Sequence, residues 1–158
     1  MFPQIPLALA LPATFLSLTI AATLPSYLVI SVVDSTGVTI GSLTGYGNFS
    51  HPGPSYPFRS APSTTTADYA SLHGYYSCDA AAGGILACGD SSGGPSGSSF
   101  SSVGGNLVLE GTDGTWSVSA PDDSGVGTDQ FGHVIGIPVY VGSTAAIPVT
   151  LSIKAATG

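Results

Sequence analysis

Three histidines, eight aspartates and one glutamate are the residues of this 158-residue chain that can carry acid–base chemistry. The histidines are His51, His73 and His133. With the many serines they offer the parts of a serine hydrolase, in which histidine takes the serine proton and aspartate orients the histidine. Such a triad is defined by geometry, which a sequence does not supply, and no Gly-x-Ser-x-Gly motif occurs. We therefore expect each histidine to be a hydrogen-bonded structural residue and the protein not to be an enzyme.

The stretch Gly89–Pro95, GDSSGGP, resembles the Gly-Asp-Ser-Gly-Gly-Pro motif around the nucleophile of trypsin-like serine proteases. It contains one extra serine, which displaces backbone N–H groups that must lie about 3 Å from the oxyanion. The residues around His51 and His73 do not match that family's Ala-Ala-His-Cys motif, and the chain is too short for its two barrels. We interpret residues 89–98 as a Gly/Ser-rich loop.

Four aspartates occupy neighbouring turns that are rich in glycine, as in many oxygen-rich calcium sites. They are Asp113, Asp122, Asp123 and Asp129. Their order does not follow an EF-hand loop, so we expect solvated turn acids and no metal or other cofactor. Glu110 is the only glutamate, and no pair of carboxylates can be assigned to glycoside hydrolysis.

Aromatic residues gather in the loop-rich first half of the chain: Tyr46, Phe49, Tyr56, Phe58, Tyr69, Tyr75 and Tyr76. Exposed rings on a β-sandwich can stack against sugar rings, and the low charge of the chain suits a neutral cell-wall polysaccharide. Tyr46, Tyr56, Tyr75 and Tyr76 are the candidate ligand platform. Alternatively, these rings are core residues whose hydroxyl groups reach a hydrogen-bond partner.

Basic residues are nearly absent, since Arg59 and Lys154 are the only two and the formal net charge is −7. Phosphate binding needs clustered lysine and arginine, so we expect no nucleic-acid partner. The same reason argues against an anionic membrane surface. Hydrophobic residues make up 43% of the chain, which indicates a folded protein rather than a disordered one.

The N-terminal run from Ile5 to Val33 contains no charged residue and has three interpretations. A secretory signal peptide would use its first apolar part and end near Ala21-Ala22. A membrane anchor would need about 20 apolar residues in one helix, which the prolines of the run oppose. The third interpretation is a strand of the mature protein. We predict a signal peptide over 1–22 and a single β-rich domain over 23–158, secreted and outside the membrane after cleavage.

Cys78 and Cys88 are ten positions apart, which fits neither a Cys-x-x-Cys redox pair nor a four-ligand zinc site. In an exported protein, we expect a disulfide between them. Asn48-Phe49-Ser50 is an N-glycosylation sequon with Asn48 as the acceptor. The apolar N-terminus, the cysteine pair and the sequon all favour secretion.

Strand signals dominate after residue 25, and helical periodicity is scarce. Hairpins are predicted over 26–43 and 106–120, and strands over 84–88, 133–142 and 146–155. Residues 67–78 fit a strand or one short helix, and we favour the strand. The proline-rich stretch 51–65 is expected to be a surface loop or a sheet edge. Regular alternation of strands and turns predicts an all-β fold, a single antiparallel β-sandwich or barrel domain.

The apolar leader, the hairpin SYLVISVVDSTGVTIGSL, the two cysteines and the segment GGNLVLEGTDGTWSVSA resemble small secreted proteins of filamentous fungi. Phialide-type cell-wall proteins are among them. This resemblance implies an extracellular or wall-associated β-protein without catalysis. We therefore expect a secreted structural or cell-wall protein; the alternatives are a carbohydrate-binding or host-interaction module and, third, a hydrolase.

Overall fold

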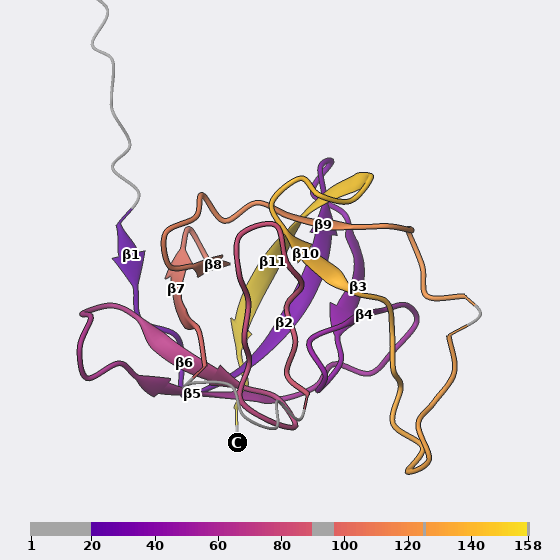
Figure 1. Ribbon diagram of the computed structural model, residues 1–158, viewed down its shortest axis with the longest axis horizontal. Helices are drawn as coiled ribbons and strands as arrows, with labels where there is room; N and C mark the ends of the chain where they lie inside the picture. Colours follow the sequence, from indigo (N-terminus) through magenta and orange to yellow (C-terminus); the bar gives the residue numbers. More distant parts are fainter. Residues whose placement is uncertain (1–19, 90–96, 125, 158) are drawn as a thin grey trace, which may run out of the picture.

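A computed structural model describes residues 20–89, 97–124 and 126–157, in which all regular structure is β. Eleven antiparallel strands form one continuous sheet (Figure 1). They are β1 Ala21–Ala22, β2 Tyr27–Asp34, β3 Thr39–Leu43, β4 Phe49–Ser50, β5 Phe58–Pro62, β6 Ala70–His73, β7 Ser99–Val103, β8 Asn106–Leu109, β9 Trp116–Val118, β10 Val139–Val141 and β11 Ile147–Ala155. The predicted all-β fold is confirmed.

Six strands close into a barrel in the order β2, β5, β6, β7, β8 and β11. The closing contact is the long pairing of β11 with β2, which runs from Val149 opposite Asp34 to Ala155 opposite Leu28. The sheet continues beyond the barrel through β3 and β4 on one side and β9 and β10 on the other. Reciprocal 2.8 Å hydrogen bonds between Phe49 and Ile137 then join β4 to the segment that precedes β10.

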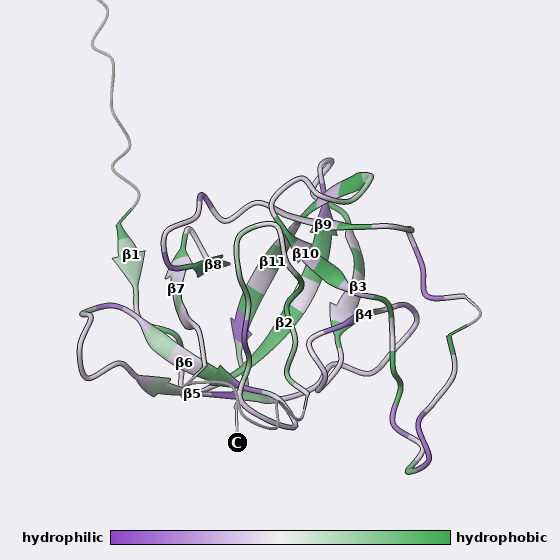
Figure 2. Cartoon of the chain, in the orientation of Figure 1, coloured by the Kyte–Doolittle hydropathy of each residue, from purple (hydrophilic) through white to green (hydrophobic). Residues whose placement is uncertain are grey.

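The barrel interior is filled by alternate residues of each strand, because side chains of a strand point to opposite faces. In β2, Leu28, Ile30 and Val32 are buried while Tyr27 is exposed. The large buried side chains of the neighbouring strands fill the same core: Phe58, Leu72, Phe100, Leu107, Trp116, Val139 and Leu151. Figure 2 shows green along most of β2, while β3 and the loops mix green with paler and purple shades.

The predicted hairpin over 26–43 is confirmed, since β2 pairs with β3 through the turn that begins at Asp34. The predicted hairpin over 106–120 is wrong. β8 pairs with β7, β9 pairs with β10, and β11 contacts both, placing Val149 opposite Trp116 and Ser152 opposite Asn106. The apolar alternation predicts that both segments are strands but contains no information about which strand lies between them.

The proline-rich stretch 51–65, expected to be a loop or an edge, contains the barrel strand β5, which is paired on both sides. Three prolines precede the strand, and Pro62 is its last residue. The interior positions therefore keep their backbone N–H groups, and the sequence rule against proline in a central strand is not violated.

The expected strand 84–88 is reduced to two isolated bridges, which join Ile85 to Tyr140 and Ala87 to Asp79. The expected strand 67–78 is shortened to β6, because the chain turns away after His73. Both segments therefore contribute loops rather than long strands, and these loops build the candidate site described below.

The predicted signal peptide, residues 1–22, lies largely outside the described residues. Ala21 and Ala22, where cleavage is predicted, form β1 and pair with Val103 and Ser102. All but the first residue of the protease-like stretch Gly89–Pro95 also lies outside them. In the portion of the chain that is described, no helix has the length and hydropathy needed to cross a membrane.

Candidate functional site

Three loop segments, residues 44–48, 74–78 and 84–89, are hydrogen-bonded to one another next to β6. The Tyr75 N–H donates to the Gly45 carbonyl at 2.7 Å, and the Cys88 N–H donates to the Tyr46 carbonyl at 2.8 Å. The predicted disulfide between Cys78 and Cys88 is present, and both of its cysteines are fully buried. It links the second segment to the third and so fixes the backbone from which the tyrosines project.

The Tyr75 ring lies directly against the backbone of Gly45. A Cβ atom at Gly45 would be 2.6 Å from the Tyr75 Cε2 atom, well inside van der Waals contact. Gly74 has the same requirement, since a Cβ atom there would be 2.2 Å from the Gly45 carbonyl oxygen. Glycine at these two positions lets the two loops approach closely enough for the Tyr75 ring to pack against the backbone.

Tyr75 is the centre of a cluster that brings together three of the four predicted platform tyrosines. Its ring centroid is 4.8 Å from that of Tyr46 and 4.7 Å from that of Tyr56, both in edge-to-face arrangements. These rings are half-buried. The fourth, Tyr76, makes no ring contact with them and is 53% exposed. The predicted platform is thus a packed cluster with one separate exposed ring beside it.

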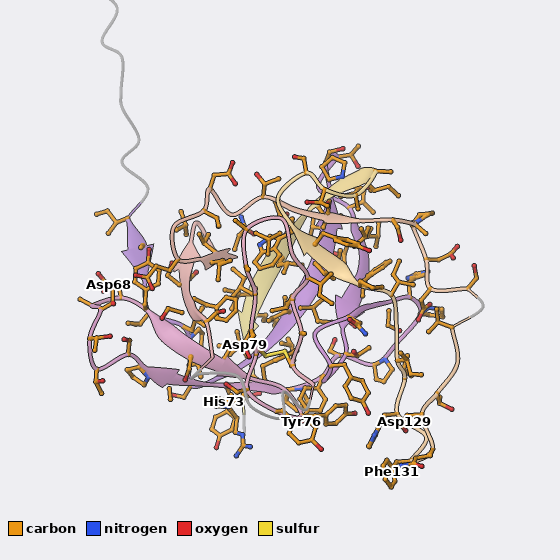
Figure 3. The ribbon with its side chains drawn as sticks, viewed as in Figure 1. Asp68, His73, Tyr76, Asp79, Asp129 and Phe131 are labelled. Atoms are coloured by element: carbon orange, nitrogen blue, oxygen red, sulfur yellow. A yellow bond between two sulfur atoms is a disulfide. The ribbon has the colours of Figure 1, made fainter. Side chains whose placement is uncertain are left out.

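A short hairpin at residues 126–136, here called the arm, contributes the rest of the site. A bridge between Thr128 and Val134 forms its stem. At its tip, the Asp129 Oδ1 atom accepts the backbone N–H groups of Phe131 at 2.8 Å and His133 at 2.9 Å. Figure 3 shows Asp129 and Phe131 at the end of this projecting segment, on the same lower edge of the molecule as Tyr76.

The arm is fastened to the tyrosine cluster by two contacts. The Tyr46 hydroxyl donates to the Asp129 Oδ2 atom, and the His133 ring lies on Tyr75 with centroids 4.6 Å apart. Phe131 extends the aromatic surface outward, since its centroid is 6.1 Å from that of His133 and its side chain is 74% exposed. We call Tyr46, Tyr56, Tyr75, Phe131 and His133 the aromatic site.

The charges of this site follow from the hydrogen bonds of Asp129. The Tyr46 hydroxyl bond, helped by the backbone and ring of His133, holds the pKa of Asp129 well below its usual range. The same bond, together with partial burial, raises the pKa of Tyr46 to about 12. Asp129 is therefore a carboxylate and Tyr46 a neutral hydrogen-bond donor at physiological pH.

The orientation of His133 is also set by Asp129, whose Oδ2 atom lies 2.9 Å from the His133 Nδ1 atom. In a neutral imidazole ring this contact places the proton on Nδ1 and leaves Nε2 as an acceptor. The His133 side chain is 42% exposed. It can therefore offer a stacking face and a hydrogen-bond acceptor to a ligand at the same time.

Two hollows border the aromatic site. One, of about 190 Å³, is lined by Tyr56, Tyr75 and His133 together with Pro54, Gly132 and neighbouring residues. The other, of about 400 Å³, is lined by Tyr46, Asp129, Asn48, Ile85 and Ile135. Neither lining contains lysine or arginine, and their one carboxylate already accepts from Tyr46.

A larger hollow, of about 470 Å³, lies elsewhere and is lined in part by Asp34 and Asp113. Each carboxylate serves its own turn: the Asp34 Oδ1 atom accepts from Thr36 and Val38, and the Asp113 Oδ1 atom accepts the Thr115 N–H. The lining of this hollow contains no aromatic side chain. We therefore assign the candidate site to the aromatic surface despite the smaller size of its hollows.

Of the other predicted residues, Asn48 lines the second hollow, and His51 and His73 line neither. The Asn48 amide donates to the Ile135 carbonyl at 3.0 Å, and glycosylation of Asn48 stays a prediction. Asp123 accepts the His51 N–H, and the His73 Nε2 atom lies 3.2 Å from the Ser71 hydroxyl. Among residues 20–89, 97–124 and 126–157, no group of three histidine, cysteine, aspartate or glutamate side chains is placed to hold a metal ion.

Sequence reasoning did not identify the roles of Asp129, Phe131 and His133. A local signal was present, because an aspartate followed three residues later by glycine is typical of a tight turn. Gly132 has a φ of 83°, which the turn requires. The packing of this turn against Tyr46 and Tyr75 joins residues more than fifty positions apart, and no local pattern predicts it.

Comparison of the chain with protein-family models, with curated proteins and with solved structures found no match.

Proposed function

We propose that this is a secreted, non-catalytic, wall-associated protein whose aromatic site binds a neutral polysaccharide. The proposal unites two expectations drawn from the sequence, a wall-associated protein and a carbohydrate-binding module. The observation that carries it is the packing of His133 on Tyr75, with the exposed Phe131 ring next to His133 and two hollows bordering the aromatic site.

The chemistry of the site suits an uncharged sugar. Aromatic rings offer apolar faces to the C–H groups of a sugar ring, while polar groups at their edges bind its hydroxyls. The His133 Nε2 atom and the Tyr56 hydroxyl supply such groups beside one hollow. Because neither hollow is lined by lysine or arginine, the site has no charge partner for an acidic ligand.

The disulfide supports the extracellular part of the proposal. Disulfides persist in oxidising compartments and are rare in the cytosol. The Cys78–Cys88 bond joins the loop that presents Tyr75 and Tyr76 to the segment 84–89. The bond that favours an extracellular location therefore also holds the loops of the site together.

Retention of the purified protein on insoluble cellulose and chitin tests the proposal. We expect saturable retention, weakened severalfold by Phe131→Ala and about tenfold by the double variant Phe131→Ala/Tyr76→Ala. Both side chains are exposed, so these changes leave the core intact. Tyr27→Ala is the matched control, because Tyr27 and Tyr76 are 54% and 53% exposed. Tyr76 directly follows the site residue Tyr75, whereas Tyr27 lies on β2.

Equal retention of wild type and Phe131→Ala/Tyr76→Ala would show that binding, if any, uses another surface. Absence of retention of the wild-type protein on every neutral polysaccharide tried would overturn the proposal directly.

A further inference from the structure

The only two Lys/Arg residues of the chain, Arg59 and Lys154, lie on one face of the barrel. Strand register places Arg59 opposite Tyr27 on β2 and also opposite His73 on β6. Lys154 on β11 lies opposite Val29, two residues along β2 from Tyr27. We call Lys154, Tyr27, Arg59 and His73 the basic strip.

These side chains point outward, because the residues that alternate with them point into the core. Leu28, Phe58 and Leu72, which precede or follow members of the strip, are fully buried. Arg59 and Lys154 are exposed, and the Tyr27 side chain is 54% exposed. The strip therefore crosses β11, β2, β5 and β6 on the solvent side of the barrel.

The four strands that carry the strip present no carboxylate beside its positive charge. The other outward positions of these four strands carry only serine, threonine, alanine, valine or proline. Within the described parts of the chain, neither Arg59 nor Lys154 forms a salt bridge with a carboxylate. A chain with a formal net charge of −7 thus concentrates all of its lysine and arginine on a face whose strands present no outward acid.

We propose that the basic strip binds an acidic polysaccharide through its carboxylate groups. Arginine binds a carboxylate in a bidentate manner, lysine acts as a point charge, and the Tyr27 ring between them can stack on a sugar. Two strand spacings separate the strands of Arg59 and Lys154, which is about 10 Å across the sheet. That separation suits repeated carboxylates along a polymer better than one small anion.

This site is distinct from the aromatic site and does not rest on the function proposed above. The acidic remainder of the surface repels an anionic polymer, so only the strip offers it a favourable approach. Binding is therefore expected to weaken as salt is added, because exposed charge pairs are screened. Retention on a neutral polysaccharide has no such dependence.

The test measures binding to polygalacturonate, a linear polyuronate, at low and high sodium chloride. We expect Arg59→Ala/Lys154→Ala to weaken binding about tenfold or more, Tyr27→Ala to weaken it severalfold, and Arg59→Lys to be intermediate. Adding Glu110→Lys to the double variant restores the formal net charge of −7 without rebuilding the strip and should not restore binding. Phe131→Ala, which changes only the arm, should bind polygalacturonate as wild type does.

Three outcomes would overturn the proposal. One is wild-type binding by Arg59→Ala/Lys154→Ala, and another is recovery of binding on adding Glu110→Lys, which would show a net-charge effect. The third is equal affinity for a single-stranded oligothymidylate of similar charge, which would make the strip a general polyanion surface. If polygalacturonate binding fails these tests while retention on cellulose or chitin persists, the aromatic-site proposal stands. If retention on cellulose and chitin is absent while polygalacturonate binding depends on Arg59 and Lys154, only the strip proposal stands.

Discussion

Tyr46 donates its hydroxyl hydrogen bond to Asp129, a residue 83 positions later, and this bond fastens the tip of the arm to the loops beside β6. The arm is also held to those loops by the packing of His133 on Tyr75 and by the hydrogen bond from the Asn48 amide to the Ile135 carbonyl at 3.0 Å. The Oδ2 atom that accepts from Tyr46 also faces the His133 Nδ1 atom. One carboxylate therefore sets both the position of the arm and the orientation of its histidine.

The Tyr46–Asp129 bond predicts an unusual titration of one tyrosine. Donation to a carboxylate favours the neutral phenol, so Tyr46 should titrate with a pKa of about 12. Asp129→Asn removes the negative acceptor, and the pKa of Tyr46 should then fall toward the ordinary value of about 10. Titration of ring Cζ signals by NMR, with Tyr46→Phe assigning the resonance, measures both values. An unchanged titration in Asp129→Asn would contradict the contact.

The same bond predicts how stability depends on pH. Folding lowers the pKa of Asp129, so its contribution is present above the ordinary carboxyl pKa of about 3.9 and is lost as pH falls through the lowered value. Folding raises the pKa of Tyr46, so its contribution is present below about pH 10 and is lost as pH rises toward 12. The difference in unfolding free energy between wild type and Asp129→Asn should be largest between about pH 5 and 9.

Denaturant unfolding at a series of pH values measures that difference. Asp68→Asn is a suitable control for the loss of one negative charge, because Asp68 is exposed and its positive φ of 65° is tolerated by asparagine. If the difference in unfolding free energy between wild type and Asp129→Asn is independent of pH, ionisation of the Asp129 carboxylate does not contribute to stability.

Gly45 should be intolerant of any side chain because the Tyr75 ring occupies that space. Gly45→Ala is expected to displace the ring and lower the unfolding free energy by about 1–3 kcal/mol, the usual cost of overpacking. It should also weaken retention on a neutral polysaccharide. Gly89→Ala is the matched control for stability, since a Cβ atom at Gly89 meets nothing within 4 Å in the described part of the chain. Equal stability of the two variants by denaturant unfolding would refute the close approach.

Removal of the disulfide should destabilise the fold and the site together. Cys78 and Cys88 are 10 residues apart, and closing a loop of that size is worth about 3 kcal/mol through the unfolded state. The double variant Cys78→Ala/Cys88→Ala should lose about that much unfolding free energy. Faster amide exchange at Tyr75 and Tyr76 is also expected, because the Tyr76 N–H donates to the Cys88 carbonyl. Unaltered exchange at these two amides would show that the disulfide does not organise the loops.

The local parts of the fold could be predicted from the sequence. The turn after β2 is an example, because the Asp34 carboxylate accepts the N–H groups of Thr36 and Val38 and Gly37 adopts a φ of 85°. The pairing of β7 with β8 was also accessible, since Gly104 and Gly105 both have positive φ, as a two-residue hairpin turn requires. The hairpin predicted over 106–120 pairs β8 with the segment that follows it, whereas this turn pairs β8 with the strand that precedes it.

The long-range parts could not be predicted in this way. Strand β11 inserts between β8 and β9, and nothing in the alternation of Leu107, Leu109 and Trp116 reveals that insertion. The contacts of the candidate site also join residues that are far apart in the sequence. Tyrosine composition indicated an aromatic surface, but only the fold brings His133 onto Tyr75 and Asp129 onto Tyr46.

The most direct test of the central claim is an NMR titration of isotope-labelled protein with soluble oligosaccharides of cellulose and chitin. If the aromatic site binds neutral sugar, amide and ring signals of Tyr75, Phe131 and His133 should shift together and saturate. Signals of Tyr27 and Arg59 should stay in place. Saturating shifts confined to another surface, or no shift with any of these sugars, would contradict the account.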